Sequence, residues 1–222
     1  MVEIKNVEVY GLEHAINASY NPMSIGDIDT TKPLPENWTE NRKKLTSVPV
    51  GSGHDTCLSG ILVTFDIKYP LYWTPQAQRY HWLQIVSSQS KMHRLMKMGK
   101  DQNFDKMFDP NTDARIIKIV QEKINYYNQI SDEIMQQDPD KQTIGIISEQ
   151  SAKLHKAFYE AIASLPAGFE MWETCTTNYQ QLKTIYFQRK NHKLTNDWGP
   201  FCKMIENLPY FKQLILDPME AK

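Results

Sequence analysis

The chain lacks the features that mark membrane, secreted or nucleic-acid-binding proteins. Its 222 residues contain no run of 18 or more apolar residues, and residues 1–13 lack the layout of a secretion signal. The 25 Lys and Arg residues are balanced by 26 Asp and Glu residues, with no long basic run to follow a phosphate backbone. We therefore expect a cytoplasmic protein that binds neither membranes nor nucleic acids.

Signals for metals, disulfides and common catalytic motifs are equally scarce. The three cysteines, Cys57, Cys175 and Cys202, are far apart and have no C-x-x-C spacing, which favours reduced thiols over a disulfide frame. The six histidines are dispersed, without an H-E-x-x-H pair. G-x-G-x-x-G, the P-loop and G-x-S-x-G are absent as well. We predict no metal site.

Alternating residues predict two strands in the first third of the chain. Residues 2–10 (VEIKNVEVY) alternate enough for an opening strand. Residues 59–69 (SGILVTFDIKY) alternate more clearly, with apolar residues from Ile61 to Ile67 on one face. The prolines of residues 19–46 predict a loop with at most short helices between the two strands.

Helical signals dominate the remainder. Thr74 and Pro75 resemble a helix start, and no helix breaker follows until Gly99, which predicts a helix from Pro75 with an interruption near Ser87 at most. Further helices are predicted from apolar spacing and proline positions around residues 116–134, 147–162, 177–193 and a last short one opened by Pro200, with Pro110 and Pro139 in polar connections. The class is α+β.

Two polar patches stand out among these elements. Residues 76–91 carry many hydrogen-bonding side chains next to the second strand. Arg189 follows Asn178 by eleven residues, which is three helical turns and so one face of a helix. These patches are the candidate functional residues of the chain.

The order of these residues resembles the flavin-dependent thymidylate synthase family. In that family a G-H-E-T segment precedes a V-x-F-T-F-x-V strand, a Q-x-x-R-H-R helix and an S-x-N-E-x-S-x-R-Y segment. Here residues 53–56 (GHDT), 61–68 and 76–81 (QAQRYH) follow in the same order, without a gap from residue 53 to residue 95. A second family segment is echoed by Leu165-Pro166, Asn178, Leu182 and Arg189.

The signature motif of the family is altered in this chain. Arg79 occupies the first arginine position, whereas Tyr80 and His81 stand where the family has histidine and arginine. The expected serine falls on Gln89, between Ser88 and Ser90, and the expected carboxylate on Ser87, unless a shift of one residue brings Ser90 into the position of the serine. The following arginine is replaced by Lys91, and a later arginine by Trp172. Anion and uracil recognition is therefore expected to be weaker or retuned.

The resemblance implies a mainly antiparallel twisted sheet flanked by long helices, as one domain over residues 1–222 that forms a homo-oligomer, a tetramer in the family. It implies FAD as cofactor, NADPH and methylenetetrahydrofolate as co-substrates of an active enzyme, and a pyrimidine deoxynucleotide such as dUMP as substrate. It assigns Arg79 and Arg189 as catalytic residues. The cofactor would be bound by His54, Tyr80, His81 and Asn178, and the substrate by Gln76, Arg79, Ser88, Ser90, Lys91 and Arg189.

Each of these roles has a plainer structural alternative. Arg79 can pair with a carboxylate across a subunit interface, and Asn178 can act only as a helix cap. Tyr80 and Trp82 can be core or subunit-contact aromatics, while the serines can satisfy backbone groups in a loop. Three hypotheses follow: a divergent thymidylate synthase or related nucleotide methyltransferase, a pseudoenzyme that binds a nucleotide or flavin without turnover, and a structural oligomer. Whether the chain is an enzyme stays open.

Overall fold

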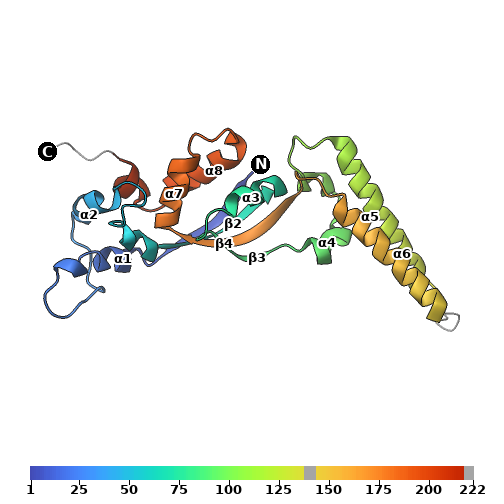
Figure 1. Ribbon diagram of the computed structural model, residues 1–222, viewed down its shortest axis with the longest axis horizontal. Helices are drawn as coiled ribbons and strands as arrows, with labels where there is room; N and C mark the ends of the chain where they lie inside the picture. Colours follow the sequence, from blue (N-terminus) through green and yellow to red (C-terminus); the bar gives the residue numbers. More distant parts are fainter. Residues whose placement is uncertain (138–143, 218–222) are drawn as a thin grey trace. The chain divides into compact units, whose positions relative to one another are not determined.

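The computed structural model describes residues 1–137 and 144–217, and the chain divides into two compact units. Unit 1 comprises Met1–Tyr69, Trp73–Ser88 and Trp172–Lys222, and unit 2 comprises Pro70–Tyr72 and Gln89–Met171. Unit 1 contains most of a β-sheet and the helices packed on it, whereas unit 2 is helical (Figure 1).

Four strands form the sheet in the order β1-β2-β4-β3. Their bounds are β1 (Glu3–Tyr10), β2 (Leu62–Pro70), β3 (Gln84–Ser88) and β4 (Glu170–Asn178). The pairs β1–β2 and β3–β4 are antiparallel. The α+β class and both predicted strands are confirmed, and the alternation of β2 places Val63, Phe65 and Ile67 in the core.

The turn between β1 and the next helix, α1 (Leu12–Ala18), requires glycine. Gly11 has φ +73°, in the left-handed region that other residues avoid. A Cβ at this position would lie 2.8 Å from the carbonyl oxygen of Gly60. This close approach joins α1 to the segment that leads into β2.

One face of the sheet is covered by helices α3 (Thr74–Ala77), α7 (Tyr179–Arg189) and α8 (Thr195–Glu206) (Figure 1). Phe201 of α8 packs edge-on against Phe65 of β2, with ring centroids 5.8 Å apart. Trp198 lies 4.7 Å from Trp73, and both indoles are almost fully buried. Each such side chain contributes about 1.5–3 kcal/mol through burial, so this aromatic layer anchors α8.

The long helix predicted from Pro75 to Gly99 is wrong. The chain instead forms the short α3, the strand β3 and a separate helix, α4 (Lys91–Met98). In β3, Ile85 is paired with Cys175 of β4, a strand that the sequence patterns did not indicate. Pairing with β4 satisfies the backbone of residues 84–88, and this long-range interaction outweighs the local helical preference.

The last two helices are confirmed, but their bounds differ from the prediction: both start elsewhere, and α7 ends at Arg189 instead of Lys193. Helix α7 begins at Tyr179 because the two preceding residues belong to β4. Helix α8 begins at Thr195, so Pro200 lies inside the helix instead of opening it. Burial of Trp198 and Phe201 on one helix outweighs the lost backbone hydrogen bond at Pro200. The remaining short elements of unit 1 are η1 (Asn21–Met23), α2 (Trp38–Thr46), η2 (Thr56–Gly60) and η6 (Lys212–Leu216).

Unit 2 is built on a hairpin of two long helices, α5 (Ala114–Met135) and α6 (Ile144–Ala163) (Figure 1). Both helices confirm the predicted spacing, whereas Pro139 lies outside the described residues. Asp113 caps α5 by accepting a hydrogen bond from the backbone N–H of Arg115 at 2.8 Å. The unit's own core contains Leu95, Phe104, Phe108, Val120, Ile124, Ala161, Phe169 and Met171.

Candidate functional site

Helix α7 carries candidate residues at both of its ends. Asn178 is the N-cap, and its Oδ1 accepts a hydrogen bond from the backbone N–H of Gln181 at 2.8 Å. The predicted capping role of Asn178 is thus present. Arg189 is the last residue of the helix. A rise of about 1.5 Å per residue separates the two by roughly 17 Å, so they serve different parts of any site.

The guanidinium of Arg189 is held by aromatic side chains. Its Nε donates a hydrogen bond to the hydroxyl of Tyr80 at 2.6 Å. The guanidinium carbon lies 4.7 Å from the ring centroid of Trp198 and 5.4 Å from that of Tyr80. The Tyr80 hydroxyl in turn donates to Oε1 of Gln188 at 3.1 Å. Cation–π contacts of this kind stabilise an arginine in one orientation.

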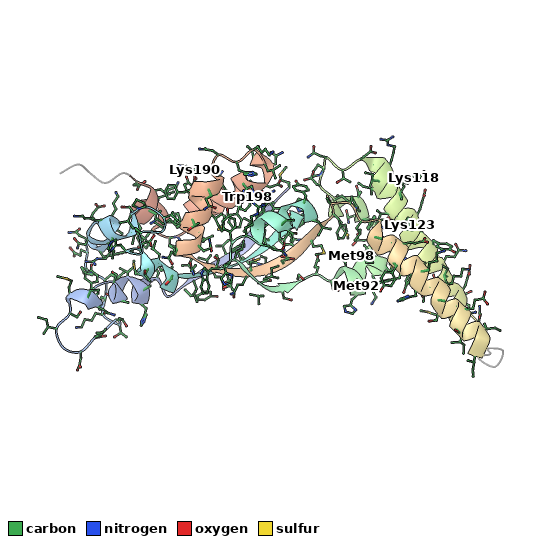
Figure 2. The ribbon with its side chains drawn as sticks, in the orientation of Figure 1. Met92, Met98, Lys118, Lys123, Lys190 and Trp198 are labelled. Carbon is green, nitrogen blue, oxygen red and sulfur yellow. The ribbon has the colours of Figure 1, made fainter. Side chains whose placement is uncertain are left out.

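Trp198 joins a further candidate residue to this group. Its Nε1–H donates to Oε1 of Gln76 at 3.1 Å, and its indole is fully buried. Figure 2 labels Trp198 on α8 together with Lys190, which follows α7 directly. We call the set formed by Gln76, Tyr80, Gln188, Arg189 and Trp198 the Arg189 cluster. The two polar patches of the sequence therefore meet here in space, through Gln76 and Tyr80 from one and Arg189 from the other.

The surroundings of the Arg189 cluster are positively charged. The pKa of His192 is lowered by partial burial first, and then by the charges of Arg189 and Lys193. Nδ1 of His192 accepts a hydrogen bond from the backbone N–H of Leu194 at 3.1 Å. Within residues 1–137 and 144–217 no carboxylate forms an ion pair with Arg189. The cluster is therefore suited to an anionic ligand.

Arg79 and His81 lie in the exposed turn between α3 and β3. Arg79 forms no hydrogen bond or ion pair with the part of the chain that the structure describes. His81 contacts the neighbouring Trp82 edge-on, with centroids 5.5 Å apart. Both side chains are accessible to a ligand or to a second subunit.

An open groove lies near the end of the sheet where β4 leads into α7. Its volume is about 550 Å³, within the range of small-molecule sites. Trp82 lies at the edge of the groove and is 57% exposed. Its backbone N–H donates to Oε1 of Gln181 at 3.3 Å. The groove is lined by Ser59, Leu62, Trp82, Gln84, Thr176, Thr177, Asn178 and Gln180. A planar ring could stack on the indole while the amides address its edge.

His54 is exposed, whereas its neighbour Asp55 is buried in a closed ion pair. Oδ2 of Asp55 lies 2.5 Å from Nζ of Lys183, and the two side chains are 3% and 1% exposed. Lys183 also donates to the carbonyl oxygens of Thr46 at 2.8 Å and Val48 at 2.6 Å. The sequence did not indicate this pair, because its two members are 128 residues apart.

The serine patch is divided between structural roles. Ser88 ends β3 and is paired with Glu173 of β4. Ser90 belongs to unit 2, where its hydroxyl caps α4 by accepting a hydrogen bond from the backbone N–H of His93 at 3.3 Å. The alternative that serines satisfy backbone groups is confirmed for Ser90. Lys91 is the first residue of α4 and is half-buried.

Among residues 1–137 and 144–217, no cluster of three or more His, Cys, Asp or Glu side chains could hold a metal ion. In the same ranges, none of the helices is long and apolar enough to cross a membrane.

The arrangement of strands and helices is the fold of the flavin-dependent thymidylate synthases, which confirms the fold implied by the sequence resemblance. The flavin-dependent thymidylate synthase ThyX of Helicobacter pylori, complexed with FAD and dUMP, matches with a TM-score of 0.62 at 13% identity, over 97% of each chain. A second structure of Thymidylate Synthase X from Helicobacter pylori, with FAD and dUMP, gives 0.59 at 13% identity over 99% of each chain. No family model and no curated protein matches the sequence.

Proposed function

We propose that this chain is a divergent flavin-dependent thymidylate synthase-like protein that binds FAD and a pyrimidine deoxynucleotide, dUMP or a close relative, for one-carbon transfer. The Helicobacter pylori structures with this fold hold FAD and dUMP. The match covers nearly all of the chain, which supports treating residues 1–222 as one such domain built from two compact units. A cytoplasmic location is part of the proposal and is supported by the three free thiols.

The observation that carries this proposal is the Arg189 cluster. It joins residues from both family-like segments around one guanidinium, whose Nε is bonded to Tyr80. The terminal nitrogens of Arg189 form no hydrogen bond with the described residues. A planar pair of N–H donors in a positive environment suits the phosphate of a nucleotide or an anionic pyrimidine edge. Arg79 is accessible for the same purpose from the neighbouring turn.

The sheet groove is the proposed position of the flavin ring. Trp82 offers an exposed aromatic face, and Asn178 and Gln84 offer amide groups for the polar edge of the ring. His54, Tyr80 and His81 complete the proposed cofactor-binding set. Reduced FAD would supply a hydride, with NADPH as its reductant, while methylenetetrahydrofolate would supply the carbon. The chain itself contributes binding and orientation.

We also propose that the chain forms a homo-oligomer, a tetramer as the family resemblance implies. Leu62, Trp82 and Val86 are 48–63% exposed, and Leu62 and Trp82 line the groove. Exposed apolar groups beside a ligand site are typical of a surface that another subunit covers. Arg79 and His81 would then contribute to a site shared between subunits. Light scattering that showed a strict monomer at all concentrations would reject this part of the proposal.

A second candidate function is ligand binding without turnover. The substitutions that favour it are His81, Ser87 and Gln89 at positions where the family has arginine, glutamate and serine. In the structure Ser87 is paired with Thr174 as part of β3. Loss of one electrostatic donor alone can lower a rate by about a hundredfold, so these changes together predict weak dUMP turnover. The retuned alternative is activity on another pyrimidine deoxynucleotide.

The visible absorption spectrum of the purified protein with added FAD, before and after dUMP, tests the binding proposal. A shifted flavin band that changes again with dUMP supports both ligands in one site. Trp82→Ala should weaken FAD binding, whereas Trp172→Ala serves as a control because Trp172 contacts Lys5 instead of the groove. An unchanged spectrum at all FAD concentrations would reject the flavoprotein assignment.

Turnover is tested by dTMP formation from dUMP, methylenetetrahydrofolate and NADPH, and by rescue of a thymidine auxotroph. The matched gain-of-function variant is His81→Arg, Ser87→Glu and Gln89→Ser combined. FAD binding without turnover in both proteins supports the second candidate. Turnover that appears only in the triple variant shows that the native chain has lost or changed the chemistry. An ordinary rate in the native chain contradicts our interpretation of the substitutions.

A further inference from the structure

Tyr80 differs from the other aromatic residues near Arg189 because its hydroxyl bonds the guanidinium directly. The hydroxyl oxygen accepts from Nε of Arg189 at 2.6 Å, and its hydrogen is donated to Oε1 of Gln188 at 3.1 Å. The hydroxyl therefore acts once as acceptor and once as donor. Since the donor direction is set by Gln188, the lone pairs of the oxygen remain directed to Arg189.

The tyrosine itself is firmly placed. Its side chain is 5% exposed, and its backbone N–H donates to the carbonyl oxygen of Ala77 at 3.0 Å. Its ring meets Trp198 edge-on, with centroids 6.0 Å apart. Trp198 is fixed in turn by burial and by its bond to Gln76. A buried hydroxyl at this place is a rigid anchor for a neighbouring charged side chain.

Arg189 is consequently held at one nitrogen and over one face. Tyr80 engages Nε, and the indole of Trp198 lies 4.7 Å from the guanidinium carbon. Nη1 and Nη2 have no hydrogen-bond partner among residues 1–137 and 144–217. An arginine that is ordered before it meets a ligand loses less conformational entropy on binding than a free one. The two terminal nitrogens are the part left for the ligand.

We propose that Tyr80 is a positioning residue whose hydroxyl presents the two terminal nitrogens of Arg189 to a phosphate oxyanion of the bound ligand. The inference rests on the proposed function and adds to it a specific task for a residue that replaces the motif histidine. The oxyanion is either the monophosphate of dUMP or the pyrophosphate of FAD. The ring of Tyr80 supports the fold, whereas its hydroxyl serves ligand binding.

The test compares Tyr80→Phe, Arg189→Ala and the double variant with the parent protein. Tyr186→Phe is the matched control, because it removes another tyrosine hydroxyl from α7. That hydroxyl donates to Oε1 of Glu206 at 2.8 Å and is not part of the Arg189 cluster. Affinity is measured by calorimetry for dUMP and for deoxyuridine, which lacks the phosphate, and by flavin fluorescence for FAD. Circular dichroism and thermal melting verify that each variant is folded.

We expect Tyr80→Phe to weaken binding of one phosphate-containing ligand about 3- to 10-fold, with deoxyuridine and the control unchanged. In the Arg189→Ala background the same change should have no further effect, because the hydroxyl acts through the guanidinium. A loss confined to dUMP assigns the nucleotide phosphate, and a loss confined to FAD assigns the pyrophosphate.

Two results would overturn the inference in distinguishable ways. If Arg189→Ala weakens ligand binding but Tyr80→Phe does not, the positioning role is wrong while the proposed ligand site stands. If Arg189→Ala leaves the affinity for dUMP and FAD unchanged, the ligand placement in the proposed function fails, and the role of Tyr80 fails with it. A loss from Tyr80→Phe that is equal for dUMP and deoxyuridine, or that persists in the Arg189→Ala background, also contradicts the inference.

Discussion

Helix α7 carries two cations that the fold treats in opposite ways. Lys183 is 1% exposed, and its ammonium group is surrounded by Asp55 and two backbone carbonyl oxygens. Arg189, six residues later, has one nitrogen bonded to Tyr80 and its terminal nitrogens open to ligands. An ammonium has three donors, and here all three are used inside the protein. Burial with complete pairing is therefore typical of a structural charge, whereas partial pairing on a rigid support is typical of a candidate binding group.

The largest effect is expected at the buried pair of Lys183 and Asp55. Lys183→Met leaves Asp55 buried without its cation, and breaking such a pair costs about 3–5 kcal/mol. Urea denaturation should show this loss in the free energy of unfolding. Lys190→Met is the control, because Lys190 is exposed and its removal should change stability by less than about 0.5 kcal/mol.

The double change Asp55→Leu with Lys183→Met sharpens this prediction. Removing both charges avoids an unpaired buried ion, so the double variant should lose less stability than the sum of the single variants. Strict additivity would contradict the view that Lys183 and Asp55 act as one structural unit.

At the C-terminal end of α7, Arg189→Lys should affect ligand binding more than folding. Lysine keeps the charge but lacks the planar fork and the Nε donor that bonds Tyr80. We expect a loss of about 1–2 kcal/mol in binding of the ligand whose phosphate Arg189 contacts, dUMP or FAD, measured by calorimetry. A variant that binds both dUMP and FAD as tightly as the parent would show that charge alone is sufficient and that the held geometry is unimportant.

The reactivity of the Cys57 thiol reports on the charge of Asp55. Its pKa is raised by burial first, and then by the negative charge of Asp55. Asp55→Asn removes that charge, so the pKa should fall and iodoacetamide alkylation at pH 8 should become faster. Cys175 and Cys202, with pKa values raised to about 12 and about 11, should stay unmodified in the folded protein and serve as controls. Slower alkylation of Cys57 in the variant would contradict this electrostatic account.

The smallest effect is expected at His192, whose pKa reports on the charge of Arg189. Its pKa is lowered by partial burial, with Arg189 and Lys193 adding to the shift. The pKa of His192 is therefore lower in the folded state than in the unfolded state. As the pH falls below about 6.5, the unfolded state binds a proton before the folded state does, so His192 reduces the stability of the protein. Arg189→Ala should raise the pKa of His192 in an NMR titration, and an unchanged pKa would place the guanidinium elsewhere.

Some elements of the structure were predictable because their signals are local. The alternation of residues 59–69 indicates β2, and the apolar spacing of residues 116–134 and 147–162 indicates α5 and α6. Each pattern repeats with the period of its element, so it survives whatever packs against it. Strand β3 shows the opposite case, because Ile85 and its neighbours become a strand only through pairing with β4.

The candidate site was predictable in its residues but not in their contacts. The sequence resemblance selected Gln76, Tyr80 and Arg189, and the fold brings all three to one cluster. It did not indicate that Tyr80 bonds Arg189 or that Trp198 lies between Gln76 and the guanidinium, since these contacts depend on how α8 packs. The Asp55–Lys183 pair had no detectable sequence signal either, because its two members are 128 residues apart.

By itself, the sequence determined the class of elements, the main helices and which polar residues deserve functional tests. Periodicity and residue type are properties of short segments, and folding does not change them. Only the tertiary structure decided which charged side chains are fully paired inside the protein and which remain accessible to a ligand. That distinction depends on distances between residues such as Lys183 and Asp55, or Arg189 and Tyr80, which are more than 100 positions apart. Side chains at such separations meet only after the chain has packed, so the difference between a structural cation and a binding cation arises in three dimensions.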